Sequence, residues 1–232
     1  MICLVGACFW ECVSRGINMG AADFDGFYRS NASFYGDRPA LSLIYYLDKY
    51  NVKGEGVGLD LGCGQGRNAL YLARRGFSMR GLDQSAEAVA RLSGLADELQ
   101  LDVNGGVADL ANMAEADIEP QHYQIIVAYT LLDHLSEEAG ARLAQAMVSG
   151  LAPGGFLFAS VFLVDDPGCS GRGGRASETA AYIRHYYRSG ELKTQFAQLE
   201  ALAYQEEYAL DLSHGWPHHH SMARLFARKP IN

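Results

Sequence analysis

Residues 59–68 read LDLGCGQGRN, a stretch in which every second position from 62 to 66 is glycine. The apolar run GVGLDL before them predicts a strand that enters a turn, and RNALYLARRG after them predicts a helix. Glycines at Gly62, Gly64 and Gly66 allow the backbone to approach a bound group closely. The stretch therefore indicates a ligand-binding turn between a strand and a helix.

The segments that follow repeat this alternation of strand and helix. In chain order they are FSMRGLD (77–83), SAEAVARLSGLADEL (85–99) with Ser85 as its N-cap, VNGGVADL (103–110), YQIIVAY (123–129), SEEAGARLAQAMVSGL (136–151) and GGFLFASVFLV (154–164). Strands that alternate with helices of this length predict a doubly wound α/β domain with a mostly parallel sheet and right-handed crossovers.

The chain after Val164 has a different pattern. A glycine-rich loop, DDPGCSGRGGRAS, is of the kind that often borders a site. SETAAYIRHYYRS (177–189) and GELKTQFAQLEA (190–201) predict two helices, and AYQEEYALDLS (203–213) and SMARLFARKP (221–230) predict two strands. We expect this last pair to be antiparallel and to complete the sheet of a single domain.

The composition of the chain limits its partners. The 232 residues are 49% hydrophobic and carry a formal net charge of −8, without a block rich in lysine or arginine. This balance argues against nucleic acid or a membrane as a partner and favours a small-molecule substrate. The five cysteines and the lack of an export signal predict free thiols and a cytoplasmic location. We expect a monomer or a homodimer.

Several ligands compete for the glycine turn. A phosphate-binding loop of the form GxxxxGK[ST] does not occur in the sequence. A dinucleotide fingerprint needs its third glycine at position 67, where the chain has Arg67. The pattern present is DxGxGxG, from Asp60 to Gly66, and a purely structural turn is the remaining alternative.

Acidic residues follow three successive predicted strands. Asp83 ends the second strand, where its carboxylate can accept both hydroxyls of a ribose; a helix N-cap is the alternative interpretation. Asp109 follows the third strand, where it can meet an adenine edge. With Asp60 these residues form a row along one edge of the sheet, which is hard to obtain by chance and indicates a nucleoside site.

Taken together, these motifs resemble those of class I S-adenosylmethionine-dependent methyltransferases. The resemblance covers about residues 39–164 and consists of DLGCGQG, GLD, ADL, VAYTLLDHL and LAPGGFLF. It implies a Rossmann-like fold with a seven-stranded sheet and S-adenosyl-L-methionine as the cofactor. The implied cofactor-binding residues are Asp60, Gly62, Cys63, Gly64 and Gly66 beside the methionine and ribose, Asp83 on the ribose hydroxyls, Asp109 near the adenine amino group, and Tyr129 beside the methionine portion.

The end of the chain is similar to the C-terminal part of the tellurite-resistance methyltransferases of the TehB type. In that group a helix opened by GEL precedes a strand, and a histidine pair precedes an A-x-L-x-A-R-K strand; His218 and His220 occupy the spaced pair here. FYRSNASFYGDRPA (27–40) resembles the segment that folds over the cofactor in this group.

We expect the following organisation of the chain. Residues 1–19 form an N-terminal extension, and 20–232 form one methyltransferase domain, which consists of a cap and helix (20–53), a cofactor-binding core (54–164), and substrate-side helices and final strands (165–232).

Candidate substrate residues lie outside the cofactor motifs. Tyr28 and Tyr35 can wall the pocket, because aromatic faces attract a sulfonium cation; packing under the N-terminal helix is the alternative. Arg38 can attract an anionic substrate, although an exposed arginine is the commoner outcome. His134, in LLDHL, lies near the expected methyl position and is a candidate catalytic base.

The histidines at the end of the chain invite comparison with a metal site. His218 and His220 share a strand face, because side chains alternate along a strand. No cysteine or carboxylate accompanies them at a familiar zinc spacing, so we expect no metal and a polar wall of the substrate pocket instead.

We therefore expect methyl transfer from S-adenosylmethionine to a small acceptor, either a thiol or a chalcogen or metalloid oxyanion. Such a transfer depends mainly on holding nucleophile and methyl group in near-attack geometry, and a soft nucleophile needs no catalytic base. An N- or O-methyltransferase of a small metabolite is the first alternative, and a non-catalytic sensor that binds the cofactor is the second. A nicotinamide or flavin oxidoreductase is disfavoured by Arg67 in place of the third glycine.

Overall fold

A computed structural model describes residues 24–30, 36–171, 173–177, 179–212 and 215–231. It contains a seven-stranded sheet in the order β3-β2-β1-β4-β5-β7-β6. The strands are β1 (Val57–Leu61), β2 (Ser78–Asp83), β3 (Val103–Val107), β4 (Tyr123–Tyr129), β5 (Leu151–Phe162), β6 (Glu200–Asp211) and β7 (His218–Arg228). The helices are α2 (Phe24–Ser30), α3 (Leu41–Lys49), α4 (Arg67–Arg74), α5 (Ala86–Glu98), α6 (Glu137–Gly150), α7 (Pro167–Ser170) and α8 (Glu191–Gln195), with 3₁₀ turns η1 (Glu115–Asp117), η2 (Leu132–His134) and η3 (Ala180–Tyr182).

The direction of the strands confirms the predicted fold class. β1 to β5 are parallel, whereas β7 lies between β5 and β6 and is antiparallel to both. The strand order changes direction between β1 and β4, because β2 and β3 continue on one side and β5 on the other. The carboxyl ends at such a switch point form the usual ligand crevice of a doubly wound sheet.

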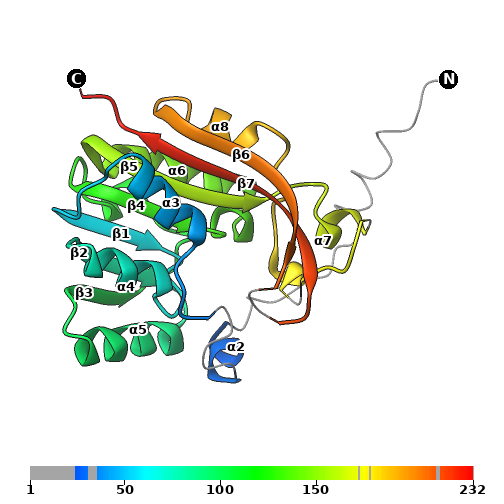
Figure 1. Ribbon diagram of the computed structural model, residues 1–232, viewed down its shortest axis with the longest axis horizontal. Helices are drawn as coiled ribbons and strands as arrows, with labels where there is room; N and C mark the ends of the chain where they lie inside the picture. The colour runs from blue at the N-terminus through cyan, green and yellow to red at the C-terminus, as the bar shows by residue number, and fades with distance from the viewer. Residues whose placement is uncertain (1–23, 31–35, 172, 178, 213–214, 232) are drawn as a thin grey trace.

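Helices cover both faces of the sheet (Figure 1). The alternation along β4 shows how the faces divide: Ile125 and Val127 pack in a cluster with residues of α3, α4 and α5, and Ile126 and Ala128 pack in a second cluster with residues of α6 and α8. All four side chains are fully buried. A parallel strand that is covered on both sides reads as a continuous apolar run, as YQIIVAY does.

The two helices predicted over 177–189 and 190–201 are much shorter in the structure. Only η3 forms within the described part of the first segment, and α8 ends at Gln195. Tyr187 is buried and pairs with Leu163 in an isolated bridge, so the chain around it is extended instead of helical. Tertiary packing of this tyrosine at the end of β5 overrides the local helical pattern.

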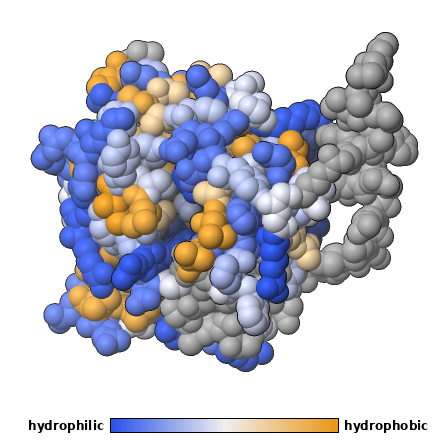
Figure 2. Space-filling model, turned by 45° about the vertical axis from the view of Figure 1, so that its right-hand side comes forward, coloured by the Kyte–Doolittle hydropathy of each residue, from blue (hydrophilic) through white to orange (hydrophobic). Residues whose placement is uncertain are grey.

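A membrane-spanning helix requires a certain length and hydropathy. In the part of the chain that the structure describes, no helix combines the length and apolar character needed to cross a bilayer. On the face shown in Figure 2, apolar side chains are interspersed with polar ones. Cys63 and Cys169 are free thiols. The cytoplasmic location and the oligomeric state remain predictions.

An aromatic stack on the α3 face offers a test of this packing. The fully buried Phe226 ring on β7 lies 5.4 Å from the Tyr46 ring of α3 and 5.6 Å from the Phe156 ring of β5. We expect Phe226→Ala to lower the free energy of unfolding by about 3–5 kcal/mol, because it leaves a cavity where three elements meet. Urea unfolding followed by circular dichroism measures this change.

The matched control is Leu41→Ala on α3, where the side chain is 76% exposed. It should change the free energy of unfolding by no more than about 0.5 kcal/mol. A loss below about 1 kcal/mol for Phe226→Ala would contradict the role given to the stack.

Candidate functional site

A cavity of about 420 Å³ lies at the carboxyl ends of β1, β2 and β4. This size is within the usual range for a pocket that holds a small molecule or cofactor. Of the residues predicted for the site, it is lined by Tyr28, Gly62, Cys63, Gly64, Asp83, Asp109, Tyr129 and His134. It is also lined by residues that were not predicted, among them Phe24, Gln84, Leu110, Thr130, Tyr182 and Arg184.

The glycine turn is held in place by the end of β2. The backbone N–H groups of Gly62 and Cys63 donate to the Leu82 carbonyl at 2.8 and 3.1 Å. The Gly64 N–H donates to the Asp83 carboxylate at 2.8 Å. Gly64 has φ +51°, a conformation that favours glycine, and a Cβ there would lie 2.8 Å from the Tyr28 hydroxyl oxygen, so the Tyr28 side chain would have to move.

Gly66 has a different structural role from Gly62 and Gly64. It is absent from the cavity lining, and its φ of +88° leads into α4. A Cβ at this position would lie 2.1 Å from Leu92 Cδ1, which is a severe clash. Gly66 therefore allows the turn to pack closely on α5.

Asp83 connects the turn to the next helix. Its second carboxylate oxygen accepts the Ser85 N–H at 2.9 Å, and Ser85 caps α5 by accepting the Ala88 N–H at 3.1 Å. The N-cap is therefore Ser85, as predicted, and Asp83 is not a cap. Burial raises the pKa of Asp83 above its ordinary value. Its carboxylate retains acceptor capacity at the cavity, because two oxygens offer about four acceptor sites.

The same serine fixes the helix that covers the cavity. The Ser85 hydroxyl donates to Asp25 of α2 at 2.5 Å, and the Glu87 N–H donates to the same carboxylate oxygen at 3.1 Å. These hydrogen bonds place Tyr28 and Phe24, both on α2, against the cavity. The cover is therefore anchored to the start of α5.

Asp60 lies behind the turn and does not line the cavity. The residue is 1% exposed, and its Oδ2 atom has no hydrogen-bond partner among the described residues. Burial raises its pKa to about 7. A buried carboxylate oxygen in this condition favours a ligand that brings a positive charge or a donor.

Asp109 and Tyr129 lie at other points of the cavity wall. Asp109 is exposed, and its carboxylate accepts the Ala111 N–H at 3.0 Å and the Asn112 side-chain amide at 2.8 Å. The Tyr129 ring lies 5.2 Å below the Arg67 guanidinium carbon, in cation–π geometry. Arg67, at the position of the missing third glycine, therefore flanks the pocket wall.

His134 lines the cavity and lies beside the Phe24 ring. The Phe24 ring lies 5.7 Å from His134 in an edge-on arrangement and 5.2 Å from Tyr182. His134 Nδ1 is buried and has no hydrogen-bond partner within the described chain. Burial lowers the pKa of His134 to about 4, so the ring is neutral at physiological pH.

Three predicted substrate residues do not line this cavity. Arg38 is exposed, His220 contacts Asp166 and Phe162 around the end of β5, and His218 contacts His220. Tyr35 falls outside the described residues. The segment after β5 does reach the site, but through Tyr182 and Arg184, for which the sequence offered only the nearby glycine-rich loop as a signal.

Comparison with known proteins identifies the family of this chain. The model of the family described as tellurite resistance protein TehB matches residues 45–214. The chain is 30% identical to Hemagglutinin 1 of Eikenella corrodens over 74% of this chain and 54% of that protein. It is 25% identical to the probable S-adenosyl-L-methionine-dependent methyltransferase TehB of Haemophilus influenzae, over 78% of this chain and 59% of that protein. The chain thus spans between half and three-fifths of these relatives.

Solved structures show the same fold. The crystal structure of TehB from Haemophilus influenzae superimposes with a TM-score of 0.67 at 21% identity, covering 88% of this chain and 66% of that one. The 1,6-didemethyltoxoflavin-N1-methyltransferase of Burkholderia thailandensis, solved with bound S-adenosylhomocysteine, superimposes with a TM-score of 0.64 at 18% identity, over 99% and 93%. Because the family model matches most of its length, the chain belongs to the TehB family of class I S-adenosylmethionine-dependent methyltransferases.

Proposed function

We propose that this chain binds S-adenosylmethionine in the cavity at the switch point and transfers its methyl group to a small-molecule acceptor. The observation that carries the proposal is the position of Asp83. Its carboxylate holds the Gly64 amide and at the same time borders the cavity, beside the glycine turn. This is the arrangement that a doubly wound sheet uses for a ribose next to a closely approached backbone.

The residues at the cavity fit this cofactor in charge and hydrogen bonding. Asp83 would accept the ribose hydroxyls, and the exposed Asp109 would accept the adenine amino group. Asp60 lies behind the glycine turn, and its Oδ2 atom has no hydrogen-bond partner among the described residues; from there its charge would balance the ammonium group of the methionine portion. When bound, the cofactor supplies an electrophilic methyl group on a sulfonium.

The protein then has to position the acceptor and exclude water. Phe24, Tyr28 and Tyr182 form an aromatic wall, in which the Phe24 ring lies 6.4 Å from Tyr28 and 5.2 Å from Tyr182. Aromatic faces attract a sulfonium cation, and a closed wall keeps the reacting groups in near-attack geometry. We propose that anchoring of α2 by Ser85 keeps this wall in place.

Two features favour an acceptor that is a soft anion, either a thiolate or a chalcogen or metalloid oxyanion. Arg184 is among the residues that line the cavity, and its positive charge acts on His134 there, so it would attract negative charge. His134 has a pKa lowered to about 4, far below the value near neutrality that suits a general base. A nucleophile that carries its own lone pair has no need of such a base.

An acceptor panel tests the proposal. We expect release of S-adenosylhomocysteine with tellurite, selenite or small thiols, and little with amines and catechols. His134→Asn should lower the turnover of a soft acceptor less than about tenfold, since no proton has to be removed. A loss of about 100-fold or more would contradict the soft-nucleophile proposal and favour N- or O-methyl transfer. Tight cofactor binding without turnover on any acceptor would favour a sensor.

The ribose assignment has its own test. Asp83→Ala should weaken S-adenosylhomocysteine binding by at least about 1 kcal/mol, because it removes a charged hydrogen-bond acceptor. Isothermal titration calorimetry measures the change. The matched control is Asp102→Ala, an exposed position just before β3, which should leave the affinity unaltered. Equal affinities for both variants, with the fold intact, would remove Asp83 from the cofactor site.

The state of Asp60 makes binding dependent on pH. With a pKa of about 7 the free carboxyl is mostly protonated at pH 6, and a bound ammonium group would favour the ionised form. We therefore expect the affinity for S-adenosylhomocysteine to rise about fivefold from pH 6 to pH 7, by about twofold more from pH 7 to pH 8, and then to level off. Calorimetry in buffers of different ionisation enthalpy should show release of a proton on binding.

Two controls isolate this effect. Asp60→Asn should remove the rise in affinity with pH. The affinity of the wild type for 5′-methylthioadenosine, which lacks the amino-acid portion, should not rise with pH. A rise of the same size in the variant would show that another group titrates.

A further inference from the structure

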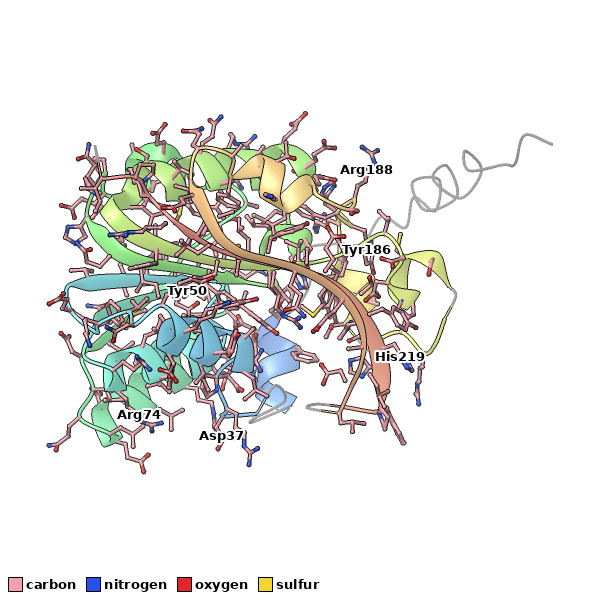
Figure 3. The ribbon with its side chains drawn as sticks, turned by 45° about the horizontal axis from the view of Figure 1, so that its top comes forward. Asp37, Tyr50, Arg74, Tyr186, Arg188 and His219 are labelled. Atoms are coloured by element: carbon pink, nitrogen blue, oxygen red, sulfur yellow. The ribbon has the colours of Figure 1, made fainter. Side chains whose placement is uncertain are left out.

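A second cluster of polar residues lies where β6 ends and β7 begins. In the antiparallel register His218 pairs with Asp211, and His220, two residues further along β7, shares the face of His218. His219 points to the other face, where it stacks on Tyr208 with ring centroids 5.3 Å apart. Figure 3 shows His219 at the end of the molecule opposite Arg74, where β7 begins.

The hydrogen bonds of the two buried imidazoles determine which ring nitrogen carries the proton. His218 Nδ1 lies 2.5 Å from the Trp216 carbonyl oxygen, which can only accept. His220 Nδ1 lies 3.1 Å from the Asp166 carboxylate, which also accepts the Ser221 N–H at 3.0 Å. Both Nδ1 atoms therefore act as donors, and in the neutral rings both Nε2 atoms carry lone pairs.

These two lone pairs face one another, because the Nε2 atoms of His218 and His220 are 2.9 Å apart. Such an arrangement is repulsive unless a cation lies between the nitrogens. Asp211 offers a carboxylate oxygen, and the three ligand atoms all lie within 4.8 Å of one another. Asp211 and the buried Asp166 together bring two carboxylates to the two imidazoles, a set of groups that suits a divalent ion.

We infer that His218, His220 and Asp211 form a binding site for a divalent transition-metal ion, with Zn²⁺ as the ion that the ligands fit. Two imidazoles and one carboxylate are a familiar zinc set, and they leave the fourth position to water or another ligand. Tetrahedral Zn–N bonds would separate the two nitrogens by about 3.3 Å, so only a small opening of the present geometry is needed.

The residues that accept hydrogen bonds from the two histidine ligands support the inference. A metal-binding histidine usually donates its other N–H to a carboxylate or a carbonyl, and Asp166 and Trp216 supply these acceptors. Asp166 also caps α7 by accepting the Gly168 N–H at 2.7 Å. The metal would thus join the β6–β7 pair to the segment that follows β5. Asp211 is brought to the histidines by the pairing of β6 with β7, and Asp166 comes from the segment after β5, so neither carboxylate stands at a familiar zinc spacing from them.

Zinc binding by the full chain, prepared without a histidine tag and stripped with a chelator, tests the site. Competition with a chromogenic chelator should give one Zn²⁺ per chain with a Kd in the micromolar range or tighter. His218→Gln, His220→Gln and Asp211→Asn should each weaken binding at least 100-fold. Asp166→Asn, which removes no ligand, should weaken it about 10–100-fold. The matched control is His219→Gln, which should bind as the wild type does.

A second measurement covers variants that fold poorly. Co²⁺ bound to the wild type should give the visible absorption of a tetrahedral ion, and Zn²⁺ should raise the melting temperature of the wild type and of His219→Gln alone. Failure of the wild type to bind Zn²⁺ below about 1 mM would overturn the inference. Unaltered Zn²⁺ binding by the double variant that carries His218→Gln and His220→Gln would overturn it as well.

Discussion

The hydrogen bond from the Gly64 amide to the Asp83 carboxylate is the contact on which the site depends. It fixes the turn after β1 to the end of β2, and the neighbouring Ser85 passes the same constraint to α5 and to Asp25 of α2. The floor of the cavity and its cover are therefore positioned by one short stretch of chain. Geometry of this kind is preorganised, so a bound ligand need not order it.

The sequence predicted this part of the molecule well for a physical reason. Parallel strands bring their carboxyl ends to one edge, so residues just after successive strands must become neighbours. Gly62, Asp83 and Asp109 meet at the cavity on this basis alone. The burial of β4 on both faces could also be predicted from the sequence, because a strand covered on both faces has no alternation of polar and apolar residues.

Other parts of the site depend on contacts that no local pattern encodes. Tyr182 and Arg184 reach the cavity from a segment whose composition is typical of a helix but which the buried Tyr187 holds extended. Phe24 reaches it because α2 is bonded to α5, some sixty residues away along the chain. The meeting of Asp211 with His218 depends on strand register, which sequence spacing does not reveal.

The register of the β6–β7 pair also limits how related chains can vary. Side chains alternate with a period of two, so deletion of one residue inside either strand would exchange its two faces. His219 would then take the place of its neighbours, and the Asp211–His218–His220 set would be lost at a single step. Changes of length in the connection between the strands leave the pairing intact. The loop can therefore change in length as long as a backbone carbonyl still accepts the His218 Nδ1–H, as that of Trp216 does, whereas change within the strands must proceed by substitution.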